Sequence, residues 1–357
     1  MRYSVQQTKE FTDFVNQTVK NLDVSGPDLG STFHALSFDE AQEALIKYRI
    51  RNKFCVPDES TSSDRALRTV QKMFDYDDNG LKTFSFNDLP KEVRSVLSQA
   101  RVTIHENFRN YRLNFSSVVL PTGETSISKG GDVSIYAKLA DKRQWASTAD
   151  CFDLAASVIY RNRYLKLIAK RHMPEYTKSD NDLLWLSFSG FRKPGFEVFK
   201  CKLLDFFTIV EGSRVTTVPK NNEVDRCINC EPLFNMVVQS VICNGIRKNV
   251  IRDKLGVDLE HAQPQHVRRL RFSRFSTIDL SSASDSNWMC VADWLYPKRF
   301  MRYVKCARSP VGTYKGTKHS FNMVSPMGNG FTFELMTSTI LHIARVLDPH
   351  ARVFGDD

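Results

Sequence analysis

The sequence predicts an α+β fold, with helices in the amino-terminal third and strands farther along the chain. Apolar residues recur at helical spacing over 11–22, 41–48, 67–74, 93–108 and 151–171. A β-rich region follows, in which 206–210 and 214–218 flank a short turn and are typical of a hairpin. Nearer the carboxyl terminus, a strand-like run over 275–280 leads through a turn into a helix.

The predicted elements begin and end at recognisable signals. Gly26-Pro27 ends the first helix, and Ser37 with Glu40 forms a capping box ahead of the second. The polar stretch 281–286 supplies capping residues for a helix over 288–295. A Gly-rich turn over 325–330 opens a further helix that continues to Leu347, and Asp348-Pro349 ends it. The last strand is expected over 351–355.

Composition and charge narrow the class of protein. The chain has 357 residues, 41% of them hydrophobic, and a formal charge of +10. These values exclude a disordered or collagen-like chain and favour a polyanionic partner such as nucleic acid or a nucleoside triphosphate. The chain starts without the apolar core of a secretory signal, and no apolar run approaches the ~20 residues that cross a bilayer. We therefore expect a soluble, cytosolic protein with reduced cysteines and no membrane partner.

Three aspartates lie at the ends of predicted strands. Asp279 ends one strand, and Asp356 and Asp357 follow another. If these strands are neighbours, the carboxylates converge, and two like charges ~4 Å apart repel by roughly 4 kcal/mol at an effective dielectric constant near 20. Two Mg²⁺ ions would relieve this repulsion and would support in-line phosphoryl transfer. Taken singly, each aspartate fits a surface loop or a helix cap better.

The order of the motifs favours the metal site over the loop interpretation. TIDLSSASDS (277–286), SPMGNGFTFEL (325–335) and FGDD (354–357) resemble, in sequence and spacing, three palm motifs of RNA-directed RNA polymerases. They are most similar to the replicases of levivirus-type positive-strand RNA bacteriophages. VPKNNEVDRCINCEP (218–232) resembles the basic fingers segment of this family, and GGDVS (130–134) also has family character.

The resemblance implies a role for each acidic motif residue. Asp279 and Asp356 match the principal metal ligands, and Asp357 matches the second acidic residue of the catalytic hairpin. Adjacent strand residues point to opposite faces, so Asp356 is the stronger candidate of that pair. Asp285 and Asn329 match the pair that recognises a ribose 2′-hydroxyl, which an acceptor and an amide can bracket. For Asp285, N-capping is an equal alternative.

Other matched residues would contact the nucleotide or the RNA. Lys220 and Arg226 match fingers residues that hold the incoming triphosphate and neutralise its charge. Ser325 and Gly328 match a turn at which the backbone approaches template or nucleotide closely. A phosphate-contacting rim is predicted ahead of Asp279, formed by Arg268, Arg269, Arg271 and Arg274. The alternative is a solvated basic loop for Lys220 and Arg226, and an exposed charged strand for the four arginines.

The family also supplies the expected domain organisation. We expect a right-hand polymerase, with helical and β-hairpin fingers and an amino-terminal helical region in 1–250, and an antiparallel-sheet palm core in 251–357. Because the chain ends directly after FGDD, we expect an incomplete palm, a missing thumb and an inactive, truncated fragment.

The implied activity is RNA-directed RNA polymerisation with two Mg²⁺ ions, for which Mn²⁺ could substitute. The implied partners are a single-stranded RNA template, nascent RNA and nucleoside triphosphates, in the cytoplasm of a bacterial host. Replicases of this family also recruit the host elongation factors Tu and Ts and a ribosomal protein. Two alternatives stay open, namely another palm polymerase such as a reverse transcriptase and a non-catalytic basic RNA-binding protein.

Two metal-like motifs are set aside. DYDDNG (75–80) resembles the start of a calcium-binding loop, but the twelfth position is Phe86 instead of a bidentate glutamate. We therefore predict a turn there. Cys227 and Cys230 have zinc-knuckle spacing, yet no second closely spaced pair follows them.

Overall fold

The computed structural model describes residues 59–128, 133–173, 179–188, 190, 193–220, 224–270 and 278–355. The helices predicted over 11–22 and 41–48 lie outside these residues, as do Asp356 and Asp357. The chain forms two compact units: a smaller one of Met1–Met73 with Thr216–Ile228, and a larger one of Phe74–Val215 with Asn229–Asp357. The helix α3 (Glu59–Asp78) crosses from the first unit into the second.

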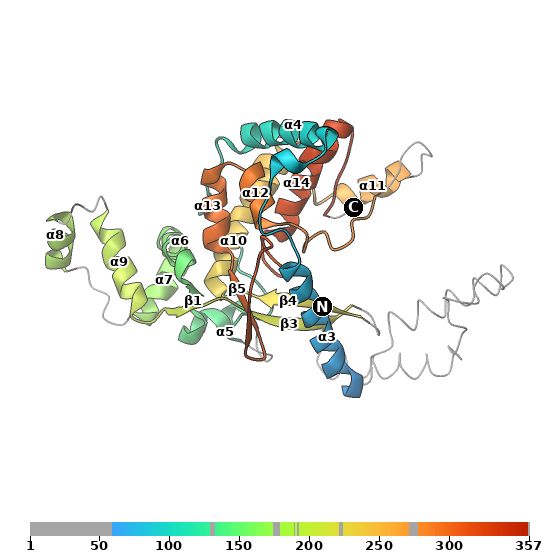
Figure 1. The fold of residues 1–357 in the computed structure, drawn as a ribbon. Helices are drawn as coiled ribbons and strands as arrows, with labels where there is room; N and C mark the ends of the chain where they lie inside the picture. The colour runs from blue at the N-terminus through green and yellow to red at the C-terminus, as the bar shows by residue number, and fades with distance from the viewer. Residues whose placement is uncertain are drawn as a thin grey trace. The chain divides into compact units, whose positions relative to one another are not determined.

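Helices build most of the larger unit (Figure 1). Its α-helices are α4 (Lys91–Phe108), α5 (Ile135–Ala140), α6 (Ala149–Arg161), α7 (Arg163–His172), α8 (Asp180–Phe188), α9 (Pro194–Leu204), α10 (Leu233–Gly245), α11 (Ala262–Leu270), α12 (Met289–Leu295), α13 (Lys298–Ala307) and α14 (Thr332–Leu347). A π-helical turn, Ile246–Arg252, continues α10. Short 3₁₀ turns lie at Phe86–Asp88 and Lys142–Gln144.

The core of the larger unit surrounds α10. Apolar side chains of α10 are fully buried, including Phe234, Val238 and Ile242. This helix packs against α6 and α13, and α14 packs against α4. A helix that is apolar on most of its circumference belongs in the interior. The core therefore holds the start of α10 and the start of α14 in fixed positions.

The helix predicted over 151–171 is two helices, α6 and α7. The backbone of Asn162 is extended between them, with φ −82° and ψ 113°. Its side-chain Oδ1 accepts hydrogen bonds from the backbone N–H groups of Tyr164 and Leu165, at 3.1 and 3.0 Å. Asn162 thus caps α7, which is a role that asparagine side chains favour.

The described strands form two small sheets. β1 (Ala146–Thr148) pairs in parallel with β2 (Thr208–Val210), with Ala146 opposite Thr208. The other sheet has the strand order β4-β3-β5-β6, formed by β3 (Ser213–Pro219), β4 (Asp225–Cys230), β5 (Val311–Tyr314) and β6 (Thr317–Ser320). In this sheet β3 pairs in parallel with β5, and β5 pairs antiparallel with β6.

These pairings correct one prediction. The hairpin expected over 206–218 is wrong, because β2 and β3 belong to different sheets. At Gly212 the chain passes so close to β5 that a Cβ there would lie 2.0 Å from the carbonyl oxygen of Val311. The antiparallel palm sheet expected in 251–357 stays a prediction: the described strands of that range, β5 and β6, pair antiparallel, and β5 also pairs in parallel with β3.

The carboxyl-terminal helices confirm the sequence pattern, whereas the strands beside them do not. α12 and α14 lie where helices were predicted over 288–295 and 333–347. Of the strand predicted over 275–280, residues 275–277 lie outside the described part of the chain; 278–280 and 351–355 are not in strands. The α+β class is confirmed, and within the described ranges no helix is both long and apolar enough to cross a membrane.

Candidate functional site

Two of the predicted motifs meet through a short backbone pairing in the larger unit. Trp288 and Met323 form an antiparallel bridge. The N–H of Met289 donates to the carbonyl oxygen of Asn322 at 3.0 Å, and the N–H of Val324 donates to that of Asn287 at 2.7 Å. The turn that contains Asp285 ends at one side of this pairing, and the Gly-rich turn 325–330 begins at the other. The pairing therefore fixes the two turns to each other at their bases.

The first turn, 281–286, carries Asp285, and Asp279 precedes it. Asp279 is exposed and lies in irregular backbone. Asp285 is half-buried and accepts a hydrogen bond from the hydroxyl of Ser284 at 3.2 Å. Burial raises the pKa of the Asp285 carboxyl, the Ser284 hydrogen bond lowers it, and the nearby charge of Asp77 raises it. Ser282 has a left-handed backbone, with φ 52°, where the chain turns.

A buried carboxylate that the sequence analysis set aside supports this turn. Asp77 lies in the last turn of α3 and is completely buried. Its oxygens accept hydrogen bonds from the backbone N–H of Asn322 and Met323 and from Nε2 of His319, at 2.8 to 3.1 Å. The turn predicted over 75–80 is wrong for 75–78, which are helical, and is present at Asn79 and Gly80. Since N–H donors surround both oxygens, Asp77 holds the backbone and is not arranged as a cation ligand.

The second turn, 325–330, is closed by its own side chains. The hydroxyls of Ser325 and Thr332 lie 2.7 Å apart. Gly328 has φ 105°, a conformation that favours glycine. Asn329 is 6% exposed, and its Oδ1 accepts a hydrogen bond from the N–H of Phe331 at 3.2 Å. Ser325 and Asn329 are thus buried turn residues, and Gly328 is exposed at the tip.

Glu231 lies beneath this turn and was missed by the sequence analysis. Its side chain is fully buried and accepts hydrogen bonds from Ser309 Oγ at 2.5 Å and from Asn329 Nδ2 at 3.4 Å. Burial raises the pKa of Glu231 to about 6, although its hydrogen bonds and the Arg308 guanidinium lower it. A glutamate beside Pro232 at the start of an apolar helix gives no sequence signal for this contact.

Lys220 and Arg226 belong to the smaller unit. Both are exposed, and the N–H of Lys220 donates to the carbonyl oxygen of Val224 at 2.9 Å where β3 leads toward β4. The neighbouring Asp225 is buried and forms an ion pair with Arg65 at 2.9 Å. The exposed cations can therefore meet a polyanion, while Asp225 serves the packing of this unit.

The arginine-rich stretch is helical up to Leu270. Arg268 and Arg269 lie in α11. Arg268 is exposed, and Arg269 Nη1 donates to the carbonyl oxygen of His350 at 3.4 Å. Arg271 and Arg274 lie outside the described residues. Of the predicted rim, the structure therefore describes only Arg268 and Arg269.

The FGDD motif is described up to Gly355. The N–H of Gly355 donates to Thr337 Oγ1 of α14 at 3.0 Å, and its φ is 71°. A Cβ at this position would lie 2.7 Å from Cε2 of Phe333. The ring of Phe354 packs edge-on against that of Phe333 at 5.0 Å. Gly355 therefore packs against α14, the helix that follows the Gly-rich turn.

Of the predicted metal ligands, the structure describes Asp279. No group of three or more His, Cys, Asp or Glu side chains in the described ranges is close enough to hold a metal ion. The exposed carboxylate of Asp279 has the hard oxygen donors that a divalent cation prefers. The described part of the chain thus contains one of the three predicted ligands, and Asp356 and Asp357 lie outside it.

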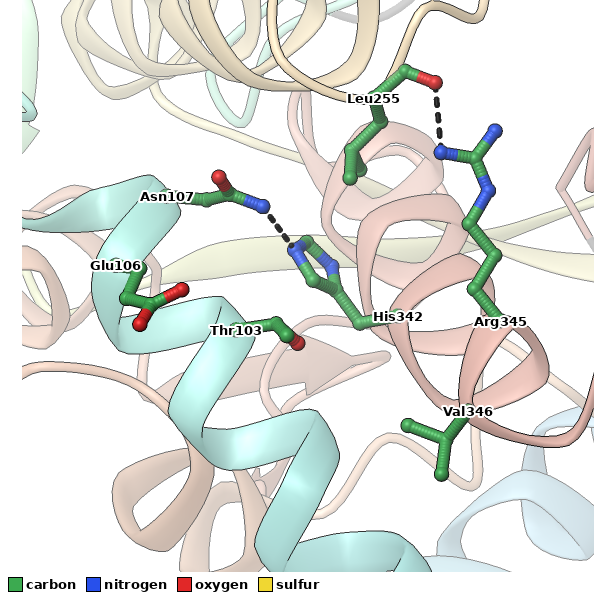
Figure 2. A pocket seen from close by; sticks show the side chains of 7 residues that line it. All are labelled: Thr103, Glu106, Asn107, Leu255, His342, Arg345 and Val346. Atoms are coloured by element: carbon green, nitrogen blue, oxygen red, sulfur yellow. Dashed lines mark hydrogen bonds between the residues drawn. The ribbon is translucent and has the colours of Figure 1, made fainter. Parts of the chain in front are cut away.

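A separate cavity of about 220 Å³ lies between α4 and α14 (Figure 2). Across it, Nδ2 of Asn107 and Nε2 of His342 are 3.0 Å apart, and Arg345 Nη1 donates to the carbonyl oxygen of Leu255 at 2.7 Å. None of the predicted site residues lines this cavity. The Asn107–His342 contact joins α4 to α14, so the cavity lies at the packing interface of these two helices.

The comparisons with known proteins concern the part of the chain that carries this geometry. Residues 195–356 match the family described as RNA replicase, beta-chain. The chain resembles RNA replicase beta chains over this segment. The resemblance predicted from three motifs is thereby confirmed. The match begins upstream of these motifs, at residue 195 in α9, and includes all four strands of the larger sheet.

Three curated relatives show the extent of this similarity. The RNA-directed RNA polymerase beta chain of Enterobacteria phage fr is 36% identical over 164 residues, 42% of this chain and 29% of the relative. The corresponding subunit beta of Escherichia virus Qbeta is 35% identical over 160 residues, 41% of this chain and 26% of the relative. The beta chain of Escherichia phage MS2 is 34% identical over 164 residues, which cover 42% of this chain and 29% of the relative. The chain thus spans less than a third of the length of these relatives.

Proposed function

We propose that this chain carries the nucleotide-binding and catalytic motifs of a phage RNA-directed RNA polymerase. The observation that carries the proposal is the similarity of 195–356 to beta chains named as RNA-directed RNA polymerases. The pairing of 287–289 with 322–324 supports it, since it fixes the turns of two motifs to each other. In domain terms, 1–250 would supply fingers and 251–357 the palm core.

Asp279, Asp356 and Asp357 would hold two divalent cations, Mg²⁺ or its substitute Mn²⁺. The exposed carboxylate of Asp279 fits this role, because its oxygens are open to a ligand. When bound, the cations would stabilise charge on the attacking and leaving oxygens of phosphoryl transfer. The protein's own contribution would be to hold these carboxylates in place for the cations.

The remaining residues would bind and orient the substrate. Lys220 and Arg226 present exposed positive charge to the triphosphate. Asp285 and Asn329 would select the ribose, and the exposed backbone at Gly328 would admit close approach of nucleotide or template. The partners would be an RNA template, nascent RNA and nucleoside triphosphates in the cytoplasm of the bacterial host. Host elongation factors Tu and Ts and a ribosomal protein follow from the family resemblance.

The test measures equilibrium binding of radiolabelled ATP to the full chain as Mg²⁺ is titrated. We expect Mg²⁺-dependent binding that weakens at least tenfold in Asp279→Asn and stays unchanged in Asp88→Asn, a matched exposed aspartate. Templated incorporation on a primed RNA is measured in parallel. Nucleotide binding that ignores Mg²⁺, or that survives in Asp279→Asn, would overturn the metal assignment. RNA binding with no nucleotide site would leave the non-catalytic RNA-binding alternative, and a preference for deoxynucleotides would indicate a reverse transcriptase.

A further inference from the structure

Two fully buried polar side chains form a seat under the Gly-rich turn 325–330. Glu231 directly precedes Pro232, the N-cap of α10, and Gln239 lies within that helix. Gln239 Oε1 accepts a hydrogen bond from the N–H of Gly330 at 2.9 Å, and Glu231 accepts one from Asn329 Nδ2 at 3.4 Å. The seat, defined as Glu231 and Gln239, therefore contacts two consecutive residues of the turn.

The segment after α13 fixes the far side of the seat. Gln239 Nε2 donates to the carbonyl oxygen of Ala307 at 2.9 Å, and Ser309 Oγ donates to Glu231 at 2.5 Å. Each seat residue is thus bonded at both ends. A buried carboxylate loses its hydration, and an apolar side chain of similar size would avoid that cost. Packing alone therefore does not account for a glutamate at this place.

The bond to Glu231 determines which way the amide of Asn329 faces. Its Nδ2 points to the Glu231 carboxylate, and its Oδ1 accepts from the N–H of Phe331 at 3.2 Å. A flipped amide would place its oxygen against the carboxylate and its N–H₂ group against another N–H donor. Each end of the amide still has one unused hydrogen-bonding position. An amide in this state presents a defined donor and acceptor to a ligand.

We propose that Glu231 is a positioning residue that fixes the amide of Asn329 in the orientation with which the turn selects the sugar of a nucleotide. This inference rests on the function proposed above, in which Asn329 reads the ribose. Glu231 acts through Asn329 and does not itself touch the nucleotide. Gln239 contributes by holding the backbone at Gly330.

The ionisation of Glu231 gives this contact a readout that is independent of activity. Burial raises the pKa of Glu231 to about 6. The titratable groups that face it are Arg308, Cys151 and Cys230. Burial raises the pKa of both thiols, so they stay neutral near pH 6, while Arg308 stays charged. A titration near pH 6 at the Asn329 amide would therefore report on Glu231.

The first arm of the test is an NMR titration of the full chain labelled with ¹⁵N-asparagine. The side-chain signals of Asn329 are assigned by their loss in Asn329→Asp. We expect these signals to shift with a midpoint near pH 6 in the wild type and to lose that transition in Glu231→Gln. An Asn329 amide that does not titrate, or that titrates equally in Glu231→Gln, would overturn the inference.

The second arm compares the affinities for ATP and dATP in the presence of Mg²⁺. Glu231→Ala is expected to lower the ATP-to-dATP preference at least fivefold. Glu231→Gln is expected to keep the preference within twofold, because its Oε1 can accept from Asn329 Nδ2. The control is Asn235→Ala, since Asn235 is also buried and bonds to Thr148 and Ala307 but not to the turn. An unchanged preference in Glu231→Ala would overturn the inference.

The two arms separate this inference from the proposed function. If the wild-type chain binds no nucleotide, the proposed function fails, and sugar selection fails with it. If the wild type prefers ATP and Glu231→Ala keeps that preference, the inference alone fails. If Glu231→Ala does not fold, as judged by circular dichroism, Glu231→Gln in the NMR arm still decides whether the contact exists.

Discussion

The carboxylate of Asp77 accepts a hydrogen bond from the backbone N–H of Met323 at 2.8 Å, although the two residues are 246 positions apart. It also accepts from the N–H of Asn322 and from His319. Met323 in turn pairs with Trp288 at the base of the turn that carries Asp285. One buried aspartate at the end of α3 thus supports both turns of the candidate site.

Asp77→Asn should destabilise the larger unit strongly. The amide would keep one acceptor oxygen but would turn an N–H₂ group toward backbone N–H donors, which leaves a buried donor unpaired. Hydrogen bonds to charged groups contribute about 1.5–3 kcal/mol each, so we expect a loss of about 3 kcal/mol in the free energy of unfolding, measured in urea. Asp78→Asn, in the neighbouring and largely exposed position, should change it by less than about 0.5 kcal/mol. Equal effects of the two variants would show that Asp77 is not the support we infer.

Glu231 should make the folded protein less stable as the pH rises. Its pKa is about 6 in the folded chain, against an ordinary value of 4.5 for an exposed glutamate, so between these values the folded state binds the proton more tightly than the unfolded state does. Stability from this group is complete below pH 4.5 and is lost as the pH rises through 6. The loss is on the order of 2 kcal/mol, and Glu231→Gln should remove it when urea unfolding is compared at pH 4.5 and 7. The same pH dependence in both proteins would contradict this.

His342 should have the opposite effect on stability. The carbonyl oxygen of Ser338 can only accept, so Nδ1 of His342 donates to it at 2.6 Å, and Nε2 accepts from Asn107 Nδ2 (Figure 2). Burial lowers the pKa of His342, a backbone hydrogen bond raises it, and Arg345 lowers it. The neutral ring therefore stabilises the fold above pH 6.5, and this contribution is lost as the pH falls through the lowered pKa.

The measurement for His342 is the slope of unfolding free energy against pH between 5 and 8. His342→Gln keeps an acceptor for Asn107 and cannot titrate, so its stability should fall less on acidification than that of the wild type. His350→Gln, at an exposed position, is the control and should keep the wild-type slope. A wild-type slope in His342→Gln would exclude the buried ring as the titrating group.

Gly355→Ala should loosen the segment that leads to Asp356. The substitution combines a left-handed backbone with a Cβ placed 2.7 Å from Phe333. Gly316→Ala is the matched control, because Gly316 has φ 92° but nothing within 4 Å of the added Cβ. Left-handed strain alone costs about 1–2 kcal/mol. We expect Gly355→Ala to lower the thermal midpoint more than Gly316→Ala does, and Phe333→Leu to reduce that difference.

Local sequence pattern predicted the helices well and their interruptions poorly. The spacing of apolar residues identified α4, α12 and α14, since each presents a continuous buried face. The same spacing predicted one helix in place of α6 and α7, because it continues past Asn162. The capping bonds of Asn162 involve only the next three residues and do not interrupt the apolar pattern. The partner of β3 was missed, since its pairing with β5 joins residues about a hundred positions apart.

The same distinction applies to the candidate site. The Gly-rich turn was found, because its residues are consecutive and glycine marks the left-handed position at 328. Glu231 and Gln239 were missed, since their contacts with the turn depend on how α10 packs. Asp77 was assigned to a turn because DYDDNG resembles the start of a calcium-binding loop without its twelfth ligand, and no local pattern shows that Asp77 ends up helical and buried.

The bond between Asp77 and Met323 also imposes an order of events during synthesis. At about 5–20 residues per second, a ribosome needs roughly 10 to 50 seconds to add the 246 residues between these positions. During that interval the carboxylate at the end of α3 has no backbone partner from 322–323. The support that Asp77 gives to the two turns can therefore form only late in translation, after 322–323 have emerged.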